Sequence, residues 1–153
     1  YIDLIKKIRL AKPEITLGTD IIVGFCGETD EQFNNTLDLY NQCDFDISYH
    51  AKYSTRPGTV ADKLFVDDIS EEIKKERWER IQEIMKKRTL EKNQIYQDKI
   101  VSVLVTECQE DYCQGNSQEM KLVRFPGDSS LVGKIVKVKI ECPERWILFG
   151  KMV

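Results

Sequence analysis

The apolar residues of the first 25 positions follow two different periods. Ile2, Ile5 and Ile8 recur at helical spacing, and Pro13 ends this pattern because proline lacks an amide donor and clashes with the preceding turn. Residues 15–25 are β-branched and nearly continuously apolar at their centre, which is typical of a strand buried on both faces in a parallel sheet. The pattern predicts a helix followed by a buried strand.

A second helix and a second strand follow. Thr29 and Gln32 have the spacing of a capping box, and apolar residues recur after them at i, i+4 and i+7 until the pattern fades near Cys43. Residues 45–53 then alternate between apolar and polar side chains, which predicts a strand with one apolar and one polar face. A strand, a helix and a strand in this order predict a right-handed crossover between parallel strands.

A long, highly charged helix is predicted over residues 70–97. Ser70 can cap it, and the acidic residues that follow suit the positive end of the helix. Its apolar residues form one narrow stripe that we expect to pack on the preceding domain: Trp78, Ile81, Ile84 and Met85. Its bases, among them residues 86–88, are predicted to form a solvated face.

Beyond Lys99 the helical period gives way to short strands. We predict them at residues 100–106, 120–125, 135–141 and 146–149, with turns at 115–117, 126–128 and 142–144. So many short strands in so few residues predict a small closed barrel, which removes exposed sheet edges. The sequence therefore predicts an α/β domain over residues 1–97 and an all-β domain over residues 98–153.

Composition places the chain among globular proteins. It has 153 residues, of which 41% are hydrophobic and 32% charged, and its net charge is -3. No run approaches the roughly 20 apolar residues that cross a bilayer, so we expect no membrane segment. The sequence begins without Met and in a helical pattern, from which we expect it to be a piece of a longer chain.

The five cysteines are odd in number and include no C-x-x-C pair. This spacing argues against a disulfide framework and against a zinc site, and it fits a reducing cytosol. Cys108 and Cys113, the nearest pair, are expected to be ordinary thiols. No metal site is predicted.

Charge is segregated within the predicted barrel. Residues 98–119 carry a net charge of -4, whereas residues 120–153 carry +4 and could present a positive face to phosphates. Alternation places two of these bases on the outside of one strand, while Phe125 and Trp146 are either core residues or stacking platforms for bases. The candidate RNA-binding residues are Lys121, Arg124, Lys137, Lys139 and Arg145.

The turn-rich loop 53–59 follows a predicted strand at its carboxyl end, where α/β proteins place binding groups. Arg56 can pair with a phosphate or a carboxylate in a bidentate way, and Pro57 and Gly58 would fix its direction. His50, the only histidine, lies on the polar face of its strand. We interpret it as a hydrogen-bonded side chain, with acid–base catalysis as the alternative.

Four blocks, in this order along the chain, carry a resemblance to a known family. They are TDIIVGFCGET at 19–29, FDISY at 45–49, YSTRPGT at 53–59 and KER at 75–77. Together they resemble the C-terminal half of the radical-SAM methylthiotransferases, and most closely those of the MiaB type. Those enzymes add a methylthio group to an N6-prenylated adenosine beside the tRNA anticodon. Residues 98–153 resemble the TRAM domain, an OB-like antiparallel β-barrel that holds RNA.

The resemblance implies a fold and a set of site residues. The chain would hold the last two parallel strands and helices of a partial radical-SAM (β/α) barrel, followed by the TRAM barrel. Ile22, Gly24 and Glu28 match a loose I-x-G-x-x-x-E pattern beside the S-adenosylmethionine adenine, with Val23 on the same strand. An apolar side chain could cover the purine there, and glycine would allow close backbone approach. Alternatively, these positions are ordinary barrel core and a turn glycine. The implied substrate-binding residues are Tyr53, Arg56 and Gly58.

The family's catalytic [4Fe-4S] cluster is bound by a C-x-x-x-C-x-x-C motif, and a second cluster lies in a separate N-terminal domain. None of the five cysteines here has that spacing, and Cys26 stands where the family usually has Pro. We therefore expect no catalytic residue and no metal ligand in this chain. We also expect that the isolated chain binds neither iron nor S-adenosylmethionine tightly.

The leading hypothesis is the C-terminal part of a cytoplasmic tRNA methylthiotransferase, inactive alone and monomeric. Its partners would be tRNA and the missing N-terminal portion of the same enzyme. One alternative within the family acts on threonylcarbamoyl-adenosine or on an aspartate of a ribosomal protein. A second alternative is a stand-alone RNA-binding module without catalysis.

Overall fold

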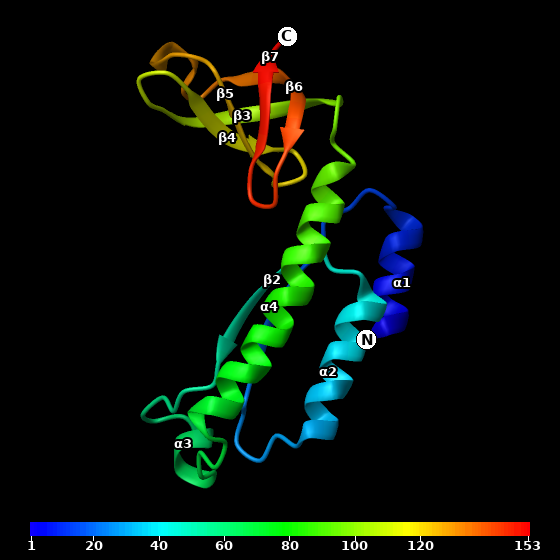
Figure 1. The fold of residues 1–153 in the computed structure, drawn as a ribbon, viewed down its shortest axis with the longest axis vertical. Helices are drawn as coiled ribbons and strands as arrows, with labels where there is room; N and C mark the ends of the chain where they lie inside the picture. The colour runs from blue at the N-terminus through cyan, green and yellow to red at the C-terminus, as the bar shows by residue number, and fades with distance from the viewer. The chain divides into compact units, whose positions relative to one another are not determined.

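The computed structural model describes residues 1–153 (Figure 1). Contacts within the chain divide it into two compact units, Tyr1–Met85 and Lys86–Val153, and we describe each by itself. The dividing point lies inside the longest helix, whereas the predicted boundary after residue 97 lies just beyond the end of that helix.

The first unit contains a parallel pair of strands with helices before, between and after them. The elements are α1 (Ile2–Ala11), β1 (Gly18–Val23), α2 (Asp30–Cys43), β2 (Ile47–Lys52), α3 (Val60–Leu64) and the start of α4 (Glu71–Gln94). The register of the two strands runs from Gly18 opposite Ile47 to Val23 opposite Lys52. The predicted parallel β-α-β arrangement is confirmed, and Thr29 forms the predicted capping box with Gln32. The short helix α3 was not predicted.

Helices cover only one face of this two-stranded sheet. Val23 packs with Phe33 of α2 and Ile81 of α4, while Ile22 on the opposite face is 59% exposed. The expectation that β1 is buried on both faces is therefore wrong for this chain, because no second layer lies on the other side. Its apolar residues alternate between a covered and an open face.

On β2 the polar side chains lie on the covered face and the apolar side chains lie on the open face. Its polar residue Ser48 is buried and His50 is half-buried toward α4, whereas Tyr49 and Ala51 lie on the open face. The two predicted faces exist, but the apolar one is the exposed one. Polar side chains can occupy the covered face because the Ser48 hydroxyl and the His50 ring form a hydrogen bond with each other.

Two groups of apolar residues hold the first unit together. Ile5, Tyr40, Phe45 and Met85 belong to one buried cluster, and Val23, Phe33 and Ile81 form the other. The predicted stripe on α4 is confirmed, because Ile81 and Met85 are buried and their stripe neighbours pack at the edges of these clusters.

The second unit is a closed five-stranded barrel. Its strands are β3 (Ile100–Cys108), β4 (Cys113–Ser117), β5 (Leu122–Phe125), β6 (Ile135–Pro143) and β7 (Leu148–Met152), in the spatial order β3-β4-β5-β7-β6. All neighbouring pairs are antiparallel except β5 and β7, which are parallel. The predicted small barrel is confirmed.

One strand of the barrel was mistaken for a turn. The polar sequence Cys113–Ser117 forms β4, although the sequence predicts a turn at residues 115–117. Gly115 explains both the composition and the strand, because a Cβ there would lie 1.9 Å from the backbone oxygen of Leu104 on β3. Glycine marks a close approach of two backbones here rather than a turn.

The barrel interior contains the residues that alternation predicts. Val138 and Ile140 are fully buried between exposed or half-exposed lysines, and Phe125 is also buried. Trp146, the other ambiguous aromatic residue, is 48% exposed in the turn between β6 and β7. Phe125 is therefore core, whereas Trp146 remains a candidate platform for stacking.

Cys108 and Cys113 form a disulfide, which corrects the expectation of ordinary thiols. The antiparallel register of β3 and β4 places the two residues directly opposite one another. The sequence analysis missed this pairing because it did not recognise β4. The other three cysteines are unpaired, and no helix of the chain is both long enough and apolar enough to span a bilayer.

Candidate functional site

Two loops leave the carboxyl edge of the parallel strands side by side. The amide of Tyr53, at the start of loop 53–59, donates a 2.8 Å hydrogen bond to the carbonyl oxygen of Val23. A small cavity of about 230 Å³ lies at this edge, and both Ile22 and Arg56 line it. The structure thus brings together one predicted cofactor-binding residue and two predicted substrate-binding residues, since Tyr53 lines the same cavity.

Loop 53–59 is fixed by its own hydrogen bonds. The hydroxyl of Thr59 donates to the carbonyl oxygen of Arg56 (2.9 Å) and accepts from the amide of Asp62, which caps α3. Gly58 has a positive φ of 85°, and its amide donates to the Asp62 carboxylate. The guanidinium of Arg56 is exposed and makes no hydrogen bond or ion pair, so it is available to an anionic ligand.

The other predicted cofactor-binding residues have different surroundings. The Val23 side chain is fully buried in the core on the helix side. Gly24 has a φ of 72°, and a Cβ there would lie 2.3 Å from Cγ of Lys74. Contacts of these two residues with a ligand on the open face would therefore use their backbone atoms.

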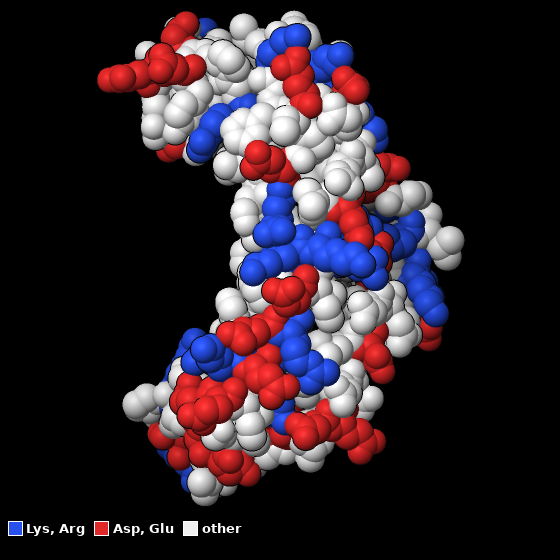
Figure 2. Space-filling model, in the orientation of Figure 1, with Lys and Arg blue, Asp and Glu red and all other residues white.

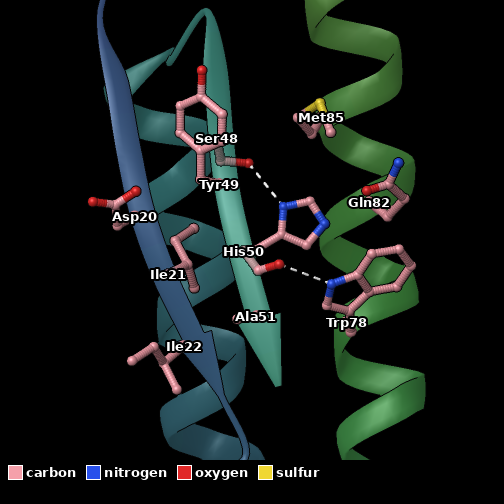
Figure 3. A pocket seen from close by; sticks show the side chains of 10 residues that line it. All are labelled: Asp20, Ile21, Ile22, Ser48, Tyr49, His50, Ala51, Trp78, Gln82 and Met85. Atoms are coloured by element: carbon pink, nitrogen blue, oxygen red, sulfur yellow. Dashed lines mark hydrogen bonds between the residues drawn. The ribbon is translucent and has the colours of Figure 1, made fainter. Parts of the chain in front are cut away.

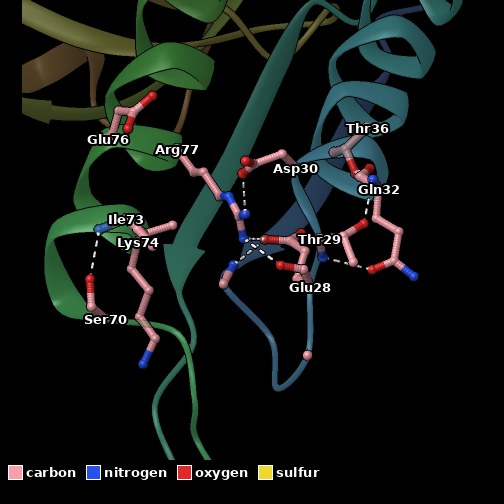
Figure 4. A network of polar contacts seen from close by, with 12 residues as sticks. Glu28, Thr29, Asp30, Gln32, Thr36, Ser70, Ile73, Lys74, Glu76 and Arg77 are labelled. Atoms are coloured by element: carbon pink, nitrogen blue, oxygen red, sulfur yellow. Dashed lines mark hydrogen bonds and ion pairs between the residues drawn. The ribbon is translucent and has the colours of Figure 1, made fainter.

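Glu28 belongs to a network of polar contacts at the start of α4 (Figure 4). Its Oε2 accepts hydrogen bonds from the Gly24 amide and from Nη1 of Arg77, each at 2.7 Å. Arg77 also donates to the Glu28 carbonyl oxygen (3.0 Å) and to Asp30 (2.7 Å), and its guanidinium lies over the Phe33 ring. The carboxylate of Glu28 is thus engaged in holding the turn after β1 to α4.

A second buried base lies one helical turn earlier. Lys74 is 2% exposed, and its ammonium group donates to Asp67 (2.7 Å) and to Glu71 (3.3 Å). Burial disfavours the charge, but the hydrogen bonds to the two carboxylates outweigh burial and raise the Lys74 pKa. Close by, a hydrogen bond to Cys26 and then burial raise the pKa of the Tyr53 hydroxyl.

The polar character of Lys74 and Arg77 gives no sign in the sequence that both bases are buried. Lys74 and Arg77 lie four residues before Trp78 and Ile81, so they continue the apolar stripe of α4 by one turn. Their helical spacing from Trp78 and Ile81, rather than their residue type, is the signal that predicts their burial. Their charges are compatible with burial only because carboxylates on neighbouring segments face them.

His50 lines a wider pocket of about 480 Å³ along β2 and α4 (Figure 3). Its Nδ1 lies 3.2 Å from the Ser48 hydroxyl, and its carbonyl oxygen accepts a 2.9 Å hydrogen bond from Nε1 of Trp78. The rings of His50 and Trp78 are 5.1 Å apart. Burial lowers the pKa of His50 below its usual value, and no carboxylate contacts its ring. This environment fits the hydrogen-bonded side chain that we expected.

The five candidate RNA-binding lysines and arginines of the barrel differ in whether their side chains already have hydrogen-bond or ion-pair partners. Lys121 is buried, Lys137 donates to the Ser102 hydroxyl (2.8 Å) and Lys139 pairs with Asp98 (3.3 Å). Arg124 donates to Gln114 and lies over the Tyr112 ring. Arg145 makes neither a hydrogen bond nor an ion pair through its side chain, and its Nε is buried without a partner.

The residues present do not fit an iron–sulfur cluster. No group of three or more His, Cys, Asp or Glu side chains is arranged to hold a metal ion. Cys26, Cys43 and Cys142 are unpaired but lie on separate elements, and the remaining two cysteines are joined to each other.

Comparisons with known proteins identify both units. Residues 94–153 match the TRAM domain. The chain thus consists of a parallel β/α segment followed by a TRAM barrel. The chain is 42% identical over 156 aligned residues to the tRNA-2-methylthio-N(6)-dimethylallyladenosine synthase of Bacillus subtilis. It is 40% identical to the enzyme of the same name from Geobacillus kaustophilus. Over its whole length the chain is homologous to the C-terminal part of MiaB-type tRNA methylthiotransferases, and this part includes their TRAM domain.

The similarity covers all of this chain but only part of the relatives. The alignment includes 100% of the chain and 30% of the B. subtilis enzyme, and 29% of the G. kaustophilus enzyme. The chain therefore spans about 30% of the length of the curated relatives it matches.

Arg77 pairs with two carboxylates, Glu28 and Asp30, and we expect neutralising Glu28 to destabilise the fold more than neutralising Asp30. We expect Glu28→Gln to lower the free energy of unfolding by about 3 kcal/mol, because it leaves the buried Arg77 charge without its main partner. Asp30→Asn, the matched control, should cost less than about 1 kcal/mol because the Asp30 side chain is 92% exposed. Urea unfolding followed by circular dichroism measures both, and equal costs would contradict this account.

The pKa of His50 gives a prediction with a definite sign. The folded chain binds a proton at His50 less readily than the unfolded chain, whose histidine titrates near pH 6.5. The contribution of His50 to stability is thus complete above about pH 6.5 and declines as the pH falls toward the folded pKa. NMR titration of this single histidine should give a pKa below 6.5. The pH dependence of Tm should also weaken in His50→Gln, and a pKa at or above 6.5 would contradict the prediction.

Proposed function

We propose that this chain is the C-terminal part of a tRNA-2-methylthio-N6-dimethylallyladenosine synthase. The observation that supports the proposal most directly is similarity to such enzymes over the whole chain, with more than 40% identity in B. subtilis. In this role the first unit supplies one wall of the cofactor and substrate site. The TRAM barrel holds the tRNA whose adenosine is modified.

The MiaB family uses S-adenosylmethionine and iron–sulfur clusters. The cluster ligands must come from outside this chain, because its cysteines do not form a ligand set. Ile22 on the open face fits a side chain that covers the adenine of S-adenosylmethionine. The side of Gly24 where a Cβ would lie is occupied by Lys74, so only its remaining backbone atoms could contact the cofactor. Tyr53 and Arg56 line the adjoining cavity, where Arg56 could hold a phosphate or carboxylate of the bound molecules.

The open sheet face supports the proposal that a further part of the enzyme packs there. Two parallel strands cannot close a (β/α) barrel, and the exposed Ile22 and Tyr49 form an apolar face with no cover. We assign that cover to the N-terminal portion of the same enzyme, since the relatives are about three times as long. The complete enzyme would act as a monomer in the cytoplasm, where its tRNA substrate is found.

A full-length chimera tests this function. The matching C-terminal 30% of the B. subtilis enzyme is replaced by this chain and expressed in a strain that lacks the native enzyme. We expect mass spectrometry of tRNA nucleosides to show the methylthio derivative of N6-dimethylallyladenosine. A chimera carrying the C-terminal part of the G. kaustophilus enzyme, which has the same name as the B. subtilis enzyme, controls for the effect of the exchange itself.

The same measurement separates the alternatives. Methylthiolation of threonylcarbamoyl-adenosine or of a ribosomal-protein aspartate would favour the other family members. If the G. kaustophilus chimera is active and the chimera with this chain is folded but modifies nothing, the chain is not a working part of such an enzyme.

Arg56 provides a prediction within the active chimera. We expect Arg56→Ala to reduce the modification rate by at least about tenfold while leaving Tm within about 2 °C, because its exposed guanidinium has no structural partner. Arg80→Ala controls for the loss of an arginine outside the cavity; its side chain is 46% exposed and contacts Glu76 and Asn34, so only its effect on the modification rate is compared. An unchanged rate in Arg56→Ala would show that the loop does not bind through this residue.

A further inference from the structure

We infer that RNA binds the second unit mainly at the turn between β6 and β7 and at the adjoining basic end of α4, not at the lysine-bearing face of the barrel. The ligand class is RNA with an unpaired base, which stacks on Trp146 while Arg145 contacts a phosphate. The basic end of α4 contributes net positive charge, although Lys87 and Arg88 there are paired with Glu91. This inference rests on the proposed tRNA-binding function and specifies the surface that performs it.

The first line of evidence is that most basic side chains of the barrel already have a partner, whereas Arg145 has none. Lys137, Lys139 and Lys151 each have a polar or acidic partner within 3.3 Å, so phosphate binding would compete with existing contacts. Arg145 has no such partner, and its buried Nε lacks a hydrogen bond. Arg145 is partly exposed, so its guanidinium can form charge-assisted hydrogen bonds with a phosphate without giving up an existing partner.

The second line of evidence is the aromatic side chain next to it. Trp146 is 48% exposed, although indole rings in small barrels usually pack into the core. A tryptophan held at a turn offers a flat face to an unstacked base, and such stacking tolerates any base. Arginine and tryptophan at consecutive positions thus combine phosphate and base contacts.

The third line of evidence is that this turn is held rigidly against a basic helix. Nδ2 of the buried Asn93, near the end of α4, donates to the carbonyl oxygens of Glu144 (2.8 Å) and Arg145 (3.0 Å). The turn is closed by a hydrogen bond from the Glu144 amide to the Ile147 carbonyl oxygen. A platform fixed in this way loses little conformational entropy when it binds.

The charge of the adjoining helix suits a polyanion. Residues 86–94 of α4 carry four bases and a single acid, Glu91, for a net charge of +3. Lys and Arg side chains gather along this part of α4 in the space-filling view (Figure 2). Asn93 holds the turn that carries Arg145 against this helix end, and the net positive charge of the segment favours RNA over a basic or neutral partner.

Binding of an anticodon stem–loop RNA to the full chain tests the inference. In a Trp78→Phe background, in which Trp146 is the only tryptophan, the RNA should quench tryptophan fluorescence, whereas a fully paired duplex should quench it much less. Trp146→Ala should weaken binding about tenfold, and Trp146→Phe should retain most of the affinity. Arg145→Gln should weaken binding and reduce the salt dependence by about one phosphate contact.

Lys151→Gln is the matched control, because this base is paired with Glu141 on the outside of the barrel. Its affinity should stay within about twofold of the wild type. The inference is overturned if Trp146→Ala and Arg145→Gln bind normally while Lys137→Gln or Lys139→Gln weakens binding, or if the chain binds no RNA. An inactive chimera combined with Trp146-dependent RNA binding would instead overturn the proposed enzyme and leave this surface intact.

Discussion

The buried guanidinium of Arg77 fixes the arrangement of the first unit. It joins three segments that are far apart in the sequence: the turn after β1, the start of α2 and the first turns of α4. Glu28 accepts from both Arg77 and the Gly24 amide, so one carboxylate sets the path of the turn and the position of the helix. A buried ion pair adds little net stability over an apolar pair, but the loss of one partner is costly because the other charge is left buried and unpaired.

That anchor determines which face of the sheet remains open. With α2 and α4 held on one side, the helix-facing positions of β1 and β2 are filled, and the opposite positions, including Ile22 and Tyr49, meet no other element. The same arrangement brings loops 24–29 and 53–59 to one edge. The open face therefore follows from the helix packing that the Arg77 network holds in place, whereas the position of Arg56 follows from the hydrogen bonds within its own loop.

Local sequence signals were sufficient for elements whose pattern is set by their own residues. The capping box at Thr29, the parallel strands and most barrel strands were predictable in this way. The missed features depend on partners distant in sequence. Gly115 reveals β4 only when the backbone of β3 at residues 104–105 lies against it. The disulfide follows only from that strand pairing, and buried Lys74 requires the facing Asp67.

The same distinction applies to the candidate RNA-binding residues. The charges along the sequence indicate a basic segment over residues 120–153, but they do not distinguish lysines that are free to bind phosphate from lysines that are paired. The fold makes that distinction. Asp98 pairs with Lys139 and Glu141 pairs with Lys151, so the two acids offset the charge of these lysines. Arg145 is left without a partner since its turn is held to α4 through backbone carbonyl oxygens alone. The hydrogen bonds of Asn93 thus use no side-chain group of the turn, and Arg145 and Trp146 remain available to a ligand.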